Sequence, residues 1–138
     1  MSAGIVLDAS VVVEGLAGEG RAAVWARGMM ATPGPLAPEL LYVEVAQSLK
    51  RHETLGKGLE QAFQDLVRLP VTHISFVDVV SVVWELRHNF SLYDALYVAI
   101  ALTHQAPLAT LDRKMASSAA GYCTVLVGPL IFGRDSVL

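Results

Sequence analysis

The stretch Gly4-Ile5-Val6-Leu7-Asp8-Ala9-Ser10, close to the start of the chain, decides the fold. Residues 4–7 are apolar and partly β-branched, a pattern typical of a short buried strand. Asp8 stands at the carboxyl end of this strand, and Ser10 is a suitable N-cap for a helix that we expect over residues 11–16. A buried strand that passes directly into a helix is how a parallel βαβ unit begins.

Downstream of this stretch, short apolar segments alternate with helical ones. We expect further strands over residues 36–37, 71–74, 108–110 and 123–127. We expect helices over residues 19–27, 39–52, 59–69, 75–86, 91–102 and 112–119, with a break at Gly56-Lys57-Gly58. This alternation predicts an α/β fold whose parallel sheet is covered by helices on both faces.

The composition is apolar for a chain of this length. The 138 residues suit a single domain, which we expect to span residues 1–138. They are 54 % hydrophobic and 17 % charged, which indicates a large core and some apolar surface left for a partner. A homodimer or a tightly bound second protein is therefore our hypothesis.

Charge and cysteine content exclude some classes of protein. The formal net charge of −3 does not suit a generic nucleic-acid coat, but it is compatible with a nucleic-acid enzyme that has an acidic pocket. Cys123 is the only cysteine, which excludes a disulfide framework and favours a reducing cytoplasm. No apolar run reaches the roughly 18 residues that span a bilayer. We therefore expect no membrane association, and the missing basic leader argues against a signal peptide.

Four carboxylates stand in otherwise apolar surroundings: Asp8, Glu44, Asp94 and Asp112. A partly buried carboxylate without a partner costs several kcal/mol, and the chain has no matching set of buried-looking Lys or Arg. A divalent cation is the economical partner. Because the ligands are all oxygens, Mg²⁺ or Mn²⁺ is favoured over zinc or copper, and metal-assisted phosphodiester hydrolysis is the preferred chemistry.

The expected elements indicate where these acids lie. Asp8 and Asp112 follow strands, so they fall at the edge where open parallel sheets bind ligands. Asp94 falls in the first turn of a helix and Glu44 about two turns into another. The four converge if those helices pack over that edge.

Four segments that carry these acids resemble the motifs of the PIN-domain nucleases. They run in the family's order over nearly the whole chain, at residues 5–10, 38–51, 91–99 and 108–114. The first is Ile5-Val6-Leu7-Asp8-Ala9-Ser10, and the last has a Thr110-Leu111-Asp112 core. With its compact size, the chain is similar to the toxin ribonucleases of toxin–antitoxin pairs of the VapC type.

The resemblance implies a fold, an activity and partners. The fold is a three-layer α/β/α arrangement with a central parallel sheet of four to five short strands. The activity is that of an Mg²⁺- or Mn²⁺-dependent endoribonuclease acting on RNA. The partners are a second copy in a homodimer and a cognate antitoxin whose C-terminal peptide lies over the site. Asp8, Glu44, Asp94 and Asp112 match the metal-binding acids, and Ser10 and Thr110 match the hydroxyls that orient carboxylate or water.

Two departures from the family pattern concern the number of metal ions. Members often have Asn three residues after the Glu, where this chain has Gln47. Some have a further acid or Asn soon after the fourth motif, where this chain has Arg113-Lys114-Met115. One ion with a transient second is compatible with this sequence, and the number stays open.

Each acid also has a simpler interpretation. Asp8 and Asp112 could be a strand end and a helix N-cap, and Asp94 could interact with a helix dipole. Glu44 could be an exposed helix residue paired with Lys50 or Arg51.

Other residues have two interpretations each. The basic residues Lys50, Arg51, Arg113 and Lys114 either rim the cleft or are merely solvated. The aromatic residues Trp25, Trp84, Tyr93 and Tyr97 suit a core or an interface better than stacking on bases. Cys123 suits a small hydrophobic position in a strand.

Two other functions are compatible with parts of the pattern. A non-catalytic PIN-like module that binds RNA or protein would keep the fold without metal or cleavage. A phosphatase of the haloacid-dehalogenase type would use Asp8 as a nucleophile, but it needs a second Asp where this chain has Ser10.

Overall fold

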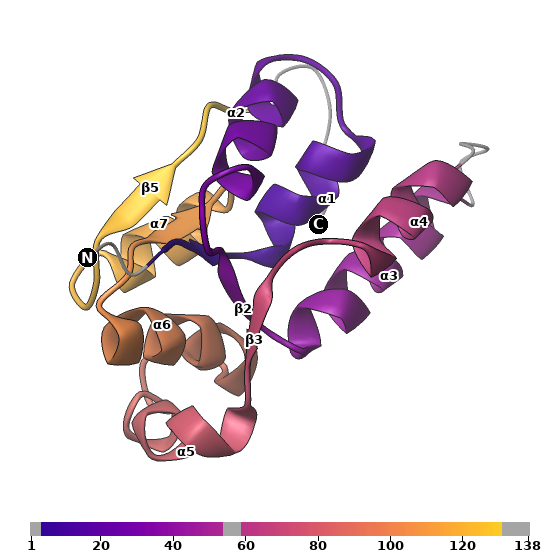
Figure 1. Ribbon diagram of the computed structural model, residues 1–138. Helices are drawn as coiled ribbons and strands as arrows, with labels where there is room; N and C mark the ends of the chain where they lie inside the picture. Colours follow the sequence, from indigo (N-terminus) through magenta and orange to yellow (C-terminus); the bar gives the residue numbers. More distant parts are fainter. Residues whose placement is uncertain (1–3, 54–58, 131–138) are drawn as a thin grey trace.

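The computed structural model describes residues 4–53 and 59–130, and its centre is a parallel sheet (Figure 1). Five short strands form the sheet in the order β3-β2-β1-β4-β5, and all four neighbouring pairs are parallel. The strands are β1 (Val6–Leu7), β2 (Leu36–Pro38), β3 (Thr72–Ile74), β4 (Leu108–Thr110) and β5 (Val125–Val127). The predicted sheet of four to five parallel strands is confirmed.

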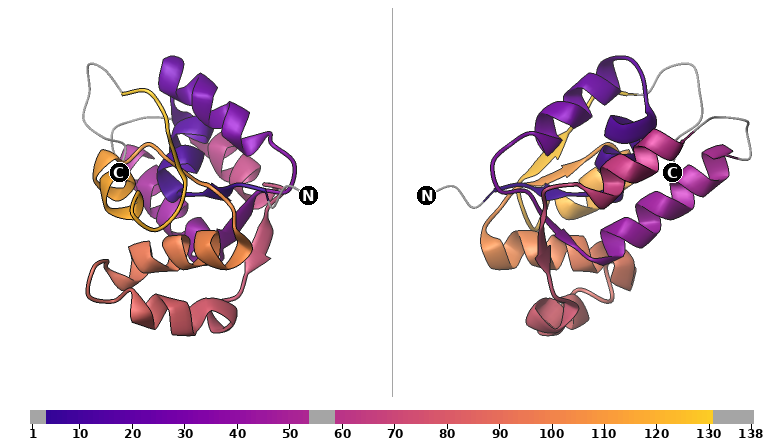
Figure 2. Two further views of the ribbon diagram at one scale, coloured as in Figure 1. Left: turned by 90° about the vertical axis from the view of Figure 1, so that its left-hand side faces the viewer. Right: turned by 45° about the vertical axis from the view of Figure 1, so that its right-hand side comes forward.

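Helices cover both faces of this sheet, so the three-layer α/β/α prediction is also confirmed. The helices are α1 (Ala9–Ala17), α2 (Arg21–Met30), α3 (Leu40–Glu53), α4 (Glu60–Val67), α5 (Phe76–Glu85), α6 (Leu92–His104) and α7 (Arg113–Ala119). In Figures 1 and 2, α1 to α4 lie on one side of the strands, and α5 and α6 lie on the other. Right-handed crossovers explain this division, because the chain crosses the sheet in one direction from β1 to β3 and in the opposite direction from β3 to β4.

The order of the strands marks one place in the sheet as special. From β1 the chain proceeds outward to β2 and β3, then returns to β4 on the other side of β1 and continues to β5. The strand order therefore reverses between β1 and β4. In open parallel sheets such a reversal opens a crevice beyond the carboxyl ends of the two strands, and ligands bind there. Asp8 and Asp112 follow these two strands.

Two buried helices fix the geometry around that crevice. In α1, Val11 to Val13 have no exposed surface, and in α6 every residue from Ala95 to Ala101 is buried. A helix that is apolar on all sides is stable only inside a core. α6 packs against β1, β2 and β4, and α5 covers its outer side. The first turn of α6, which carries Asp94, is thus attached to a rigid part of the molecule.

Several boundaries differ from the predicted ones. α1 begins at Ala9 with Asp8 as its N-cap residue, so the prediction of Ser10 as the cap is wrong. α2 continues to Met30, three residues past the predicted end, because no residue before Thr32-Pro33 stops it. β5 begins only at Val125, and Cys123 lies in the preceding loop, where its thiol contacts the Ala119 carbonyl at 3.8 Å.

The predicted break at Gly56-Lys57-Gly58 lies outside the described residues. Among the helices of the described part, none has both the length and the apolar character to span a bilayer.

Candidate functional site

Asp8 is the most firmly held of the four acids. The residue is 8 % exposed, and the hydroxyls of Ser10 and Thr110 both donate to Oδ2 of its carboxylate at 2.7 Å. The two hydroxyl oxygens in turn accept the backbone amides of Leu111 and Asp112, each at 3.0 Å. This network joins the start of α1 to the end of β4. It engages one oxygen of Asp8, and within the described part of the chain no hydrogen bond reaches the other.

Asp112 is both a helix cap and a neighbour of Asp8. Its Oδ1 accepts the amides of Lys114 at 2.9 Å and Met115 at 3.1 Å, which caps α7. The simpler interpretation of Asp112 as an N-cap is therefore correct. It does not exclude a second role, because no hydrogen bond among the described residues uses Oδ2.

Glu44 projects from the second turn of α3 and receives a hydrogen bond from the opposite layer. The phenol of Tyr97, a buried residue of α6, donates to Glu44 Oε1 at 2.6 Å. The alternative pairing of Glu44 with Lys50 or Arg51 is wrong. Within the described residues Glu44 has no such partner, and Arg51 donates to the Ser48 hydroxyl at 2.9 Å.

Asp94 stands at the amino end of α6, as predicted. Ser91 is the N-cap residue, and its hydroxyl accepts the Asp94 amide at 3.1 Å, which fixes the backbone of this turn. Apart from the Ser91 hydroxyl, which also lowers the pKa of the Asp94 carboxyl, no residue that the structure describes hydrogen-bonds to this carboxylate. It is the least restrained of the four acids.

All four acids line one pocket of about 440 Å³, which we call the carboxylate pocket. Its lining consists of Asp8, Ala9, Leu40, Val43, Glu44, Gln47, Ser48, Arg51, Tyr93, Asp94 and Asp112. The structure thus brings together two acids that follow β1 and β4 and two acids that lie on α3 and α6. Ser10 and Thr110 do not line the pocket. They lie behind Asp8, almost fully buried, where they orient its carboxylate.

The acids of this pocket disfavour one another's charge. Burial is the main cause that raises the pKa of Asp8 above its usual value, and the charges of Asp112 and Asp94 raise it further. Burial also raises the pKa of Glu44, against the lowering effect of the Tyr97 hydrogen bond. For Asp94, partial burial and the charge of Asp112 raise the pKa. Mutual repulsion of this kind is what a bound cation relieves.

The chemistry of the donors fits a hard divalent cation. Every acid of the pocket offers at least one carboxylate oxygen that no described residue engages, and oxygen ligands suit Mg²⁺ and Mn²⁺. Among the described residues, no three Asp, Glu, His or Cys side chains are already close enough together to hold an ion. The pocket therefore has suitable ligands in one place, and binding requires them to move inward.

The sequence is similar to those of known proteins. Residues 5–120 match the PIN domain family model. Ribonuclease VapC1 of Mycobacterium tuberculosis is 36 % identical over 125 residues, which cover 87 % of this chain and 94 % of that protein. Ribonuclease VapC9 of the same species and VapC ribonuclease Mb0985 of Mycobacterium bovis are each 33 % identical over 129 residues, covering 91 % and 98 %.

The chain belongs to the PIN-domain family, among the VapC ribonucleases. The prediction of a VapC-type PIN domain from four motifs is confirmed. Membership of this family also removes the phosphatase alternative, in which Asp8 would act as a nucleophile.

The basic residues of this PIN domain divide into different roles. Arg51 lines the carboxylate pocket, whereas Lys50 lines a neighbouring groove between α3 and α4. Arg113 donates to the Gly128 carbonyl at 2.7 Å, so its guanidinium holds the end of β5. Lys114 lies near enough to Asp94 to lower its pKa. Arg51 and Lys114 are thus the basic residues best placed to meet a phosphate.

Three side chains of this PIN domain were missed or misread in the sequence. Tyr97 is a core residue, as predicted, but it also holds Glu44, and its place one helical turn after Asp94 was the available signal. Tyr93 is 64 % exposed, which excludes a place in the core. Glu14 is a fifth acid in apolar surroundings, and it is fully buried within α1. Its side chain lies so close to Gly18 that a Cβ added at this glycine would clash with Glu14 Oε1. It does not line the carboxylate pocket.

Proposed function

We propose that this PIN domain is a metal-dependent endoribonuclease that hydrolyses RNA phosphodiester bonds, and that it is the toxin of a VapBC-type toxin–antitoxin pair. One observation carries the proposal. Four acids from distant parts of the chain line one pocket at the reversal of strand order, each with an unengaged oxygen. The names of the VapC relatives, which are ribonucleases, support the choice of RNA as substrate.

In this proposal the metal ligands are Asp8, Glu44, Asp94 and Asp112. A bound Mg²⁺ or Mn²⁺ would supply charge stabilisation for an in-line displacement at phosphorus and would lower the pKa of the attacking water. Asp8 is the central ligand because its position is fixed on two sides. Asp112 uses Oδ1 to cap α7, so its contribution to the ion is limited to Oδ2. We therefore propose one firmly bound ion and a second that binds transiently.

The residues around the ligands have supporting roles. Ser10 and Thr110 are positioning residues that hold Asp8 through Oδ2. Arg51 lines the pocket and offers a positive charge to an RNA phosphate. Leu40 and Val43 form an apolar side of the pocket.

We further propose that the chain forms a homodimer and binds a cognate antitoxin in the cytoplasm. Exposed apolar residues support the dimer: Val77, Val80 and Trp84 follow one another along the outer side of α5, with exposures of 76 %, 40 % and 59 %. Such a stripe on a helix usually marks an interface. Sedimentation that shows only monomer at micromolar concentration would contradict the dimer.

The substitution Asp94→Asn tests the catalytic proposal. Apart from the Ser91 hydroxyl, no described residue hydrogen-bonds to the carboxylate, so the fold and the thermal melt should stay nearly unchanged while metal-dependent cleavage of total RNA is lost. The wild-type protein with EDTA is the matched control. If wild-type protein neither binds Mg²⁺ or Mn²⁺ nor cleaves RNA, the chain is instead a non-catalytic RNA- or protein-binding module. Normal cleavage by Asp94→Asn would refute the assignment of the site.

A further inference from the structure

A row of polar side chains on α3 continues along the carboxylate pocket beyond the acids. Residues at intervals of three and four share one face of a helix. The polar residues of α3 that line the pocket have this spacing, and they are Glu44, Gln47, Ser48 and Arg51. Of the described residues that line the pocket, Arg51 alone is basic. The row therefore begins with a proposed metal ligand and ends with a positive charge.

The guanidinium of Arg51 is held by the helix that carries it. Its Nη2 donates to the Ser48 hydroxyl at 2.9 Å, and Ser48 is only 1 % exposed. Helix side chains tilt toward the amino end of their helix, so the long side chain of Arg51 reaches back over the preceding turn. A buried hydroxyl thus fixes an exposed side chain that would otherwise occupy many rotamers.

This position lies beyond the acids. Ser48 follows Glu44 by four residues, so at 1.5 Å per residue the guanidinium held by Ser48 lies about 6 Å farther along the helix axis. A guanidinium in contact with a carboxylate lowers its pKa, but Arg51 is not among the groups that lower the pKa of Glu44. The separation is close to the distance between successive phosphates of a nucleic-acid strand.

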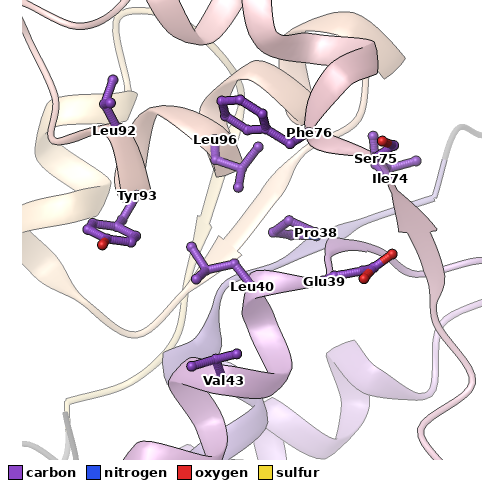
Figure 3. A pocket seen from close by; sticks show the side chains of 10 residues that line it. All are labelled: Pro38, Glu39, Leu40, Val43, Ile74, Ser75, Phe76, Leu92, Tyr93 and Leu96. Carbon is purple, nitrogen blue, oxygen red and sulfur yellow. The ribbon is translucent and has the colours of Figure 1, made fainter.

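The amino end of α3 offers no such charge. There the carboxylate pocket joins a second pocket of about 720 Å³, and Leu40, Val43 and Tyr93 line both (Figure 3). The described residues that line this second pocket include no Lys or Arg, so it does not suit a phosphate. Along α3, the charge that attracts phosphate therefore lies on one side of the acids, the side of Arg51.

We propose that Arg51 and Ser48 form a subsite for the RNA phosphate next to the scissile one. The acids and their cation bind the scissile phosphate, and Arg51 binds its neighbour on one side. Ser48 is a positioning residue that acts through Arg51. A planar guanidinium can form two parallel hydrogen bonds with phosphate oxygens, whereas the ammonium of lysine acts as a point charge. This inference rests on the proposed ribonuclease function and adds to it a direction for the RNA strand along α3.

The substrate series that tests this neutralises one linkage at a time. A short single-stranded RNA with a mapped cleavage site receives an uncharged methylphosphonate at single linkages on either side of that site. Each modified linkage follows a 2′-deoxy sugar, because an adjacent hydroxyl would attack it, and the control has the same sugar with an ordinary phosphate. We expect kcat/KM of the wild-type protein to fall about ten-fold at one of the two neighbouring linkages, the size of one charged contact.

Variants of the two residues assign the contact. Arg51→Ala should lower kcat/KM for the unmodified substrate about ten-fold, mainly through KM, and should abolish the effect of the sensitive linkage. Arg51→Lys should recover only part of the loss. Ser48→Ala should lower kcat/KM about three- to five-fold, and it should have no further effect in an Arg51→Ala background. Lys50→Ala removes a neighbouring charge of α3 and is the matched control, which should keep the sensitivity to that linkage.

Each result supports or overturns the subsite. If the losses from Ser48→Ala and Arg51→Ala multiply in the double variant, Ser48 has only a structural role and does not position Arg51. If Arg51→Ala lowers activity but leaves the sensitivity to the linkage unchanged, Arg51 does not bind that phosphate. The linkage series with wild-type protein and with the variants of Arg51, an exposed residue, decides the subsite even when Ser48→Ala destabilises the fold.

The failure of this inference differs from that of the proposed function. If wild-type protein cleaves RNA, Asp94→Asn does not, and no neighbouring linkage is sensitive, the ribonuclease site stands and the phosphate subsite is wrong. Binding of the same oligonucleotides in EDTA gives a second measurement. Without cleavage but with binding that depends on Arg51 and on one linkage, the subsite stands and hydrolysis is wrong. Absence of both cleavage and such binding removes both proposals.

Discussion

The acids that follow strands and the acids that lie on helices are held in different ways. Asp8 and Asp112 follow β1 and β4, and each has one oxygen fixed by two hydrogen bonds from nearby hydroxyls or amides. Glu44 is held by a single phenol, and the Asp94 carboxylate by no described residue other than Ser91 of its own helix cap. The strand side of the pocket is thus rigid, and the helix side can adjust. A cation would bind to the fixed acids and draw the helix acids inward.

The largest expected effect is loss of activity when either kind of acid is neutralised. Asp8→Asn and Asp94→Asn should each lower kcat/KM at least about 100- to 1000-fold, as expected when a group that stabilises transition-state charge is removed. The comparison is measured with one RNA substrate at saturating Mn²⁺. If Asp8→Asn keeps a tenth or more of the wild-type activity, Asp8 is not the central ligand.

The next largest effect is expected when the hydrogen bonds that hold Asp8, on the strand side of the pocket, are disrupted. Thr110→Val removes a donor to Asp8 and the acceptor of the Asp112 amide, which leaves buried polar groups unsatisfied. We expect the free energy of unfolding to fall by about 1–3 kcal/mol and activity to fall about 10- to 100-fold, as for lost orienting groups around metal ligands. Urea denaturation and kcat/KM measure the two. Thr110→Ser keeps the hydroxyl and should remain close to wild type in both.

On the helix side the corresponding change is Tyr97→Phe. It keeps the buried ring and removes only the donor to Glu44. Because the phenol is a single restraint on an adjustable acid, we expect activity to fall no more than about ten-fold and stability to change by about 1 kcal/mol. Equal losses for Tyr97→Phe and Thr110→Val would contradict the distinction between a rigid and an adjustable side.

The smallest expected effect is a change in the thermal stability of the wild-type protein when a cation is added. Burial and neighbouring charges raise the pKa values of Asp8, Glu44 and Asp94 in the metal-free protein. A raised carboxyl pKa stabilises the fold below the unfolded-state pKa, and this contribution is lost as the pH rises through the folded-state value. We expect the increase in Tm on adding Mn²⁺ in place of EDTA to be larger at pH 8 than at pH 5. An increase that is the same at both values would show that the cation does not meet these acids.

The same distinction explains what could be predicted from the sequence. Asp8 and Asp112 were found by elementary reasoning, because a strand end places a side chain at the ligand-binding edge of a parallel sheet. Glu44 and Asp94 needed the family motifs as well, because sequence alone does not define how two helices pack over an edge. The bond from Tyr97 to Glu44 spans 53 residues, so the position of Tyr97 one helical turn after Asp94 indicates that it lies near the site but does not identify its partner.

The wrong predictions have physical causes too. Ser10 looks like a helix cap, but its hydroxyl is used by Asp8 and by a backbone amide from the far side of the sheet. Glu14 was overlooked because its neighbours resemble an ordinary apolar helix. For Tyr93, predicted to lie in a core or an interface, the exposure excludes the core and is compatible with an interface.

The hydrogen bond from Thr110 to Asp8 also has a consequence for synthesis of the protein. The two residues are 102 positions apart, so Asp8 is synthesised 102 residues before Thr110. Its carboxylate is not fixed until the ribosome has produced β4 and that strand has joined the sheet. A chain still being translated therefore lacks a finished site. The RNA nearest to such a chain, the message and the ribosome itself, does not meet a finished site before β4 has been made and has joined the sheet.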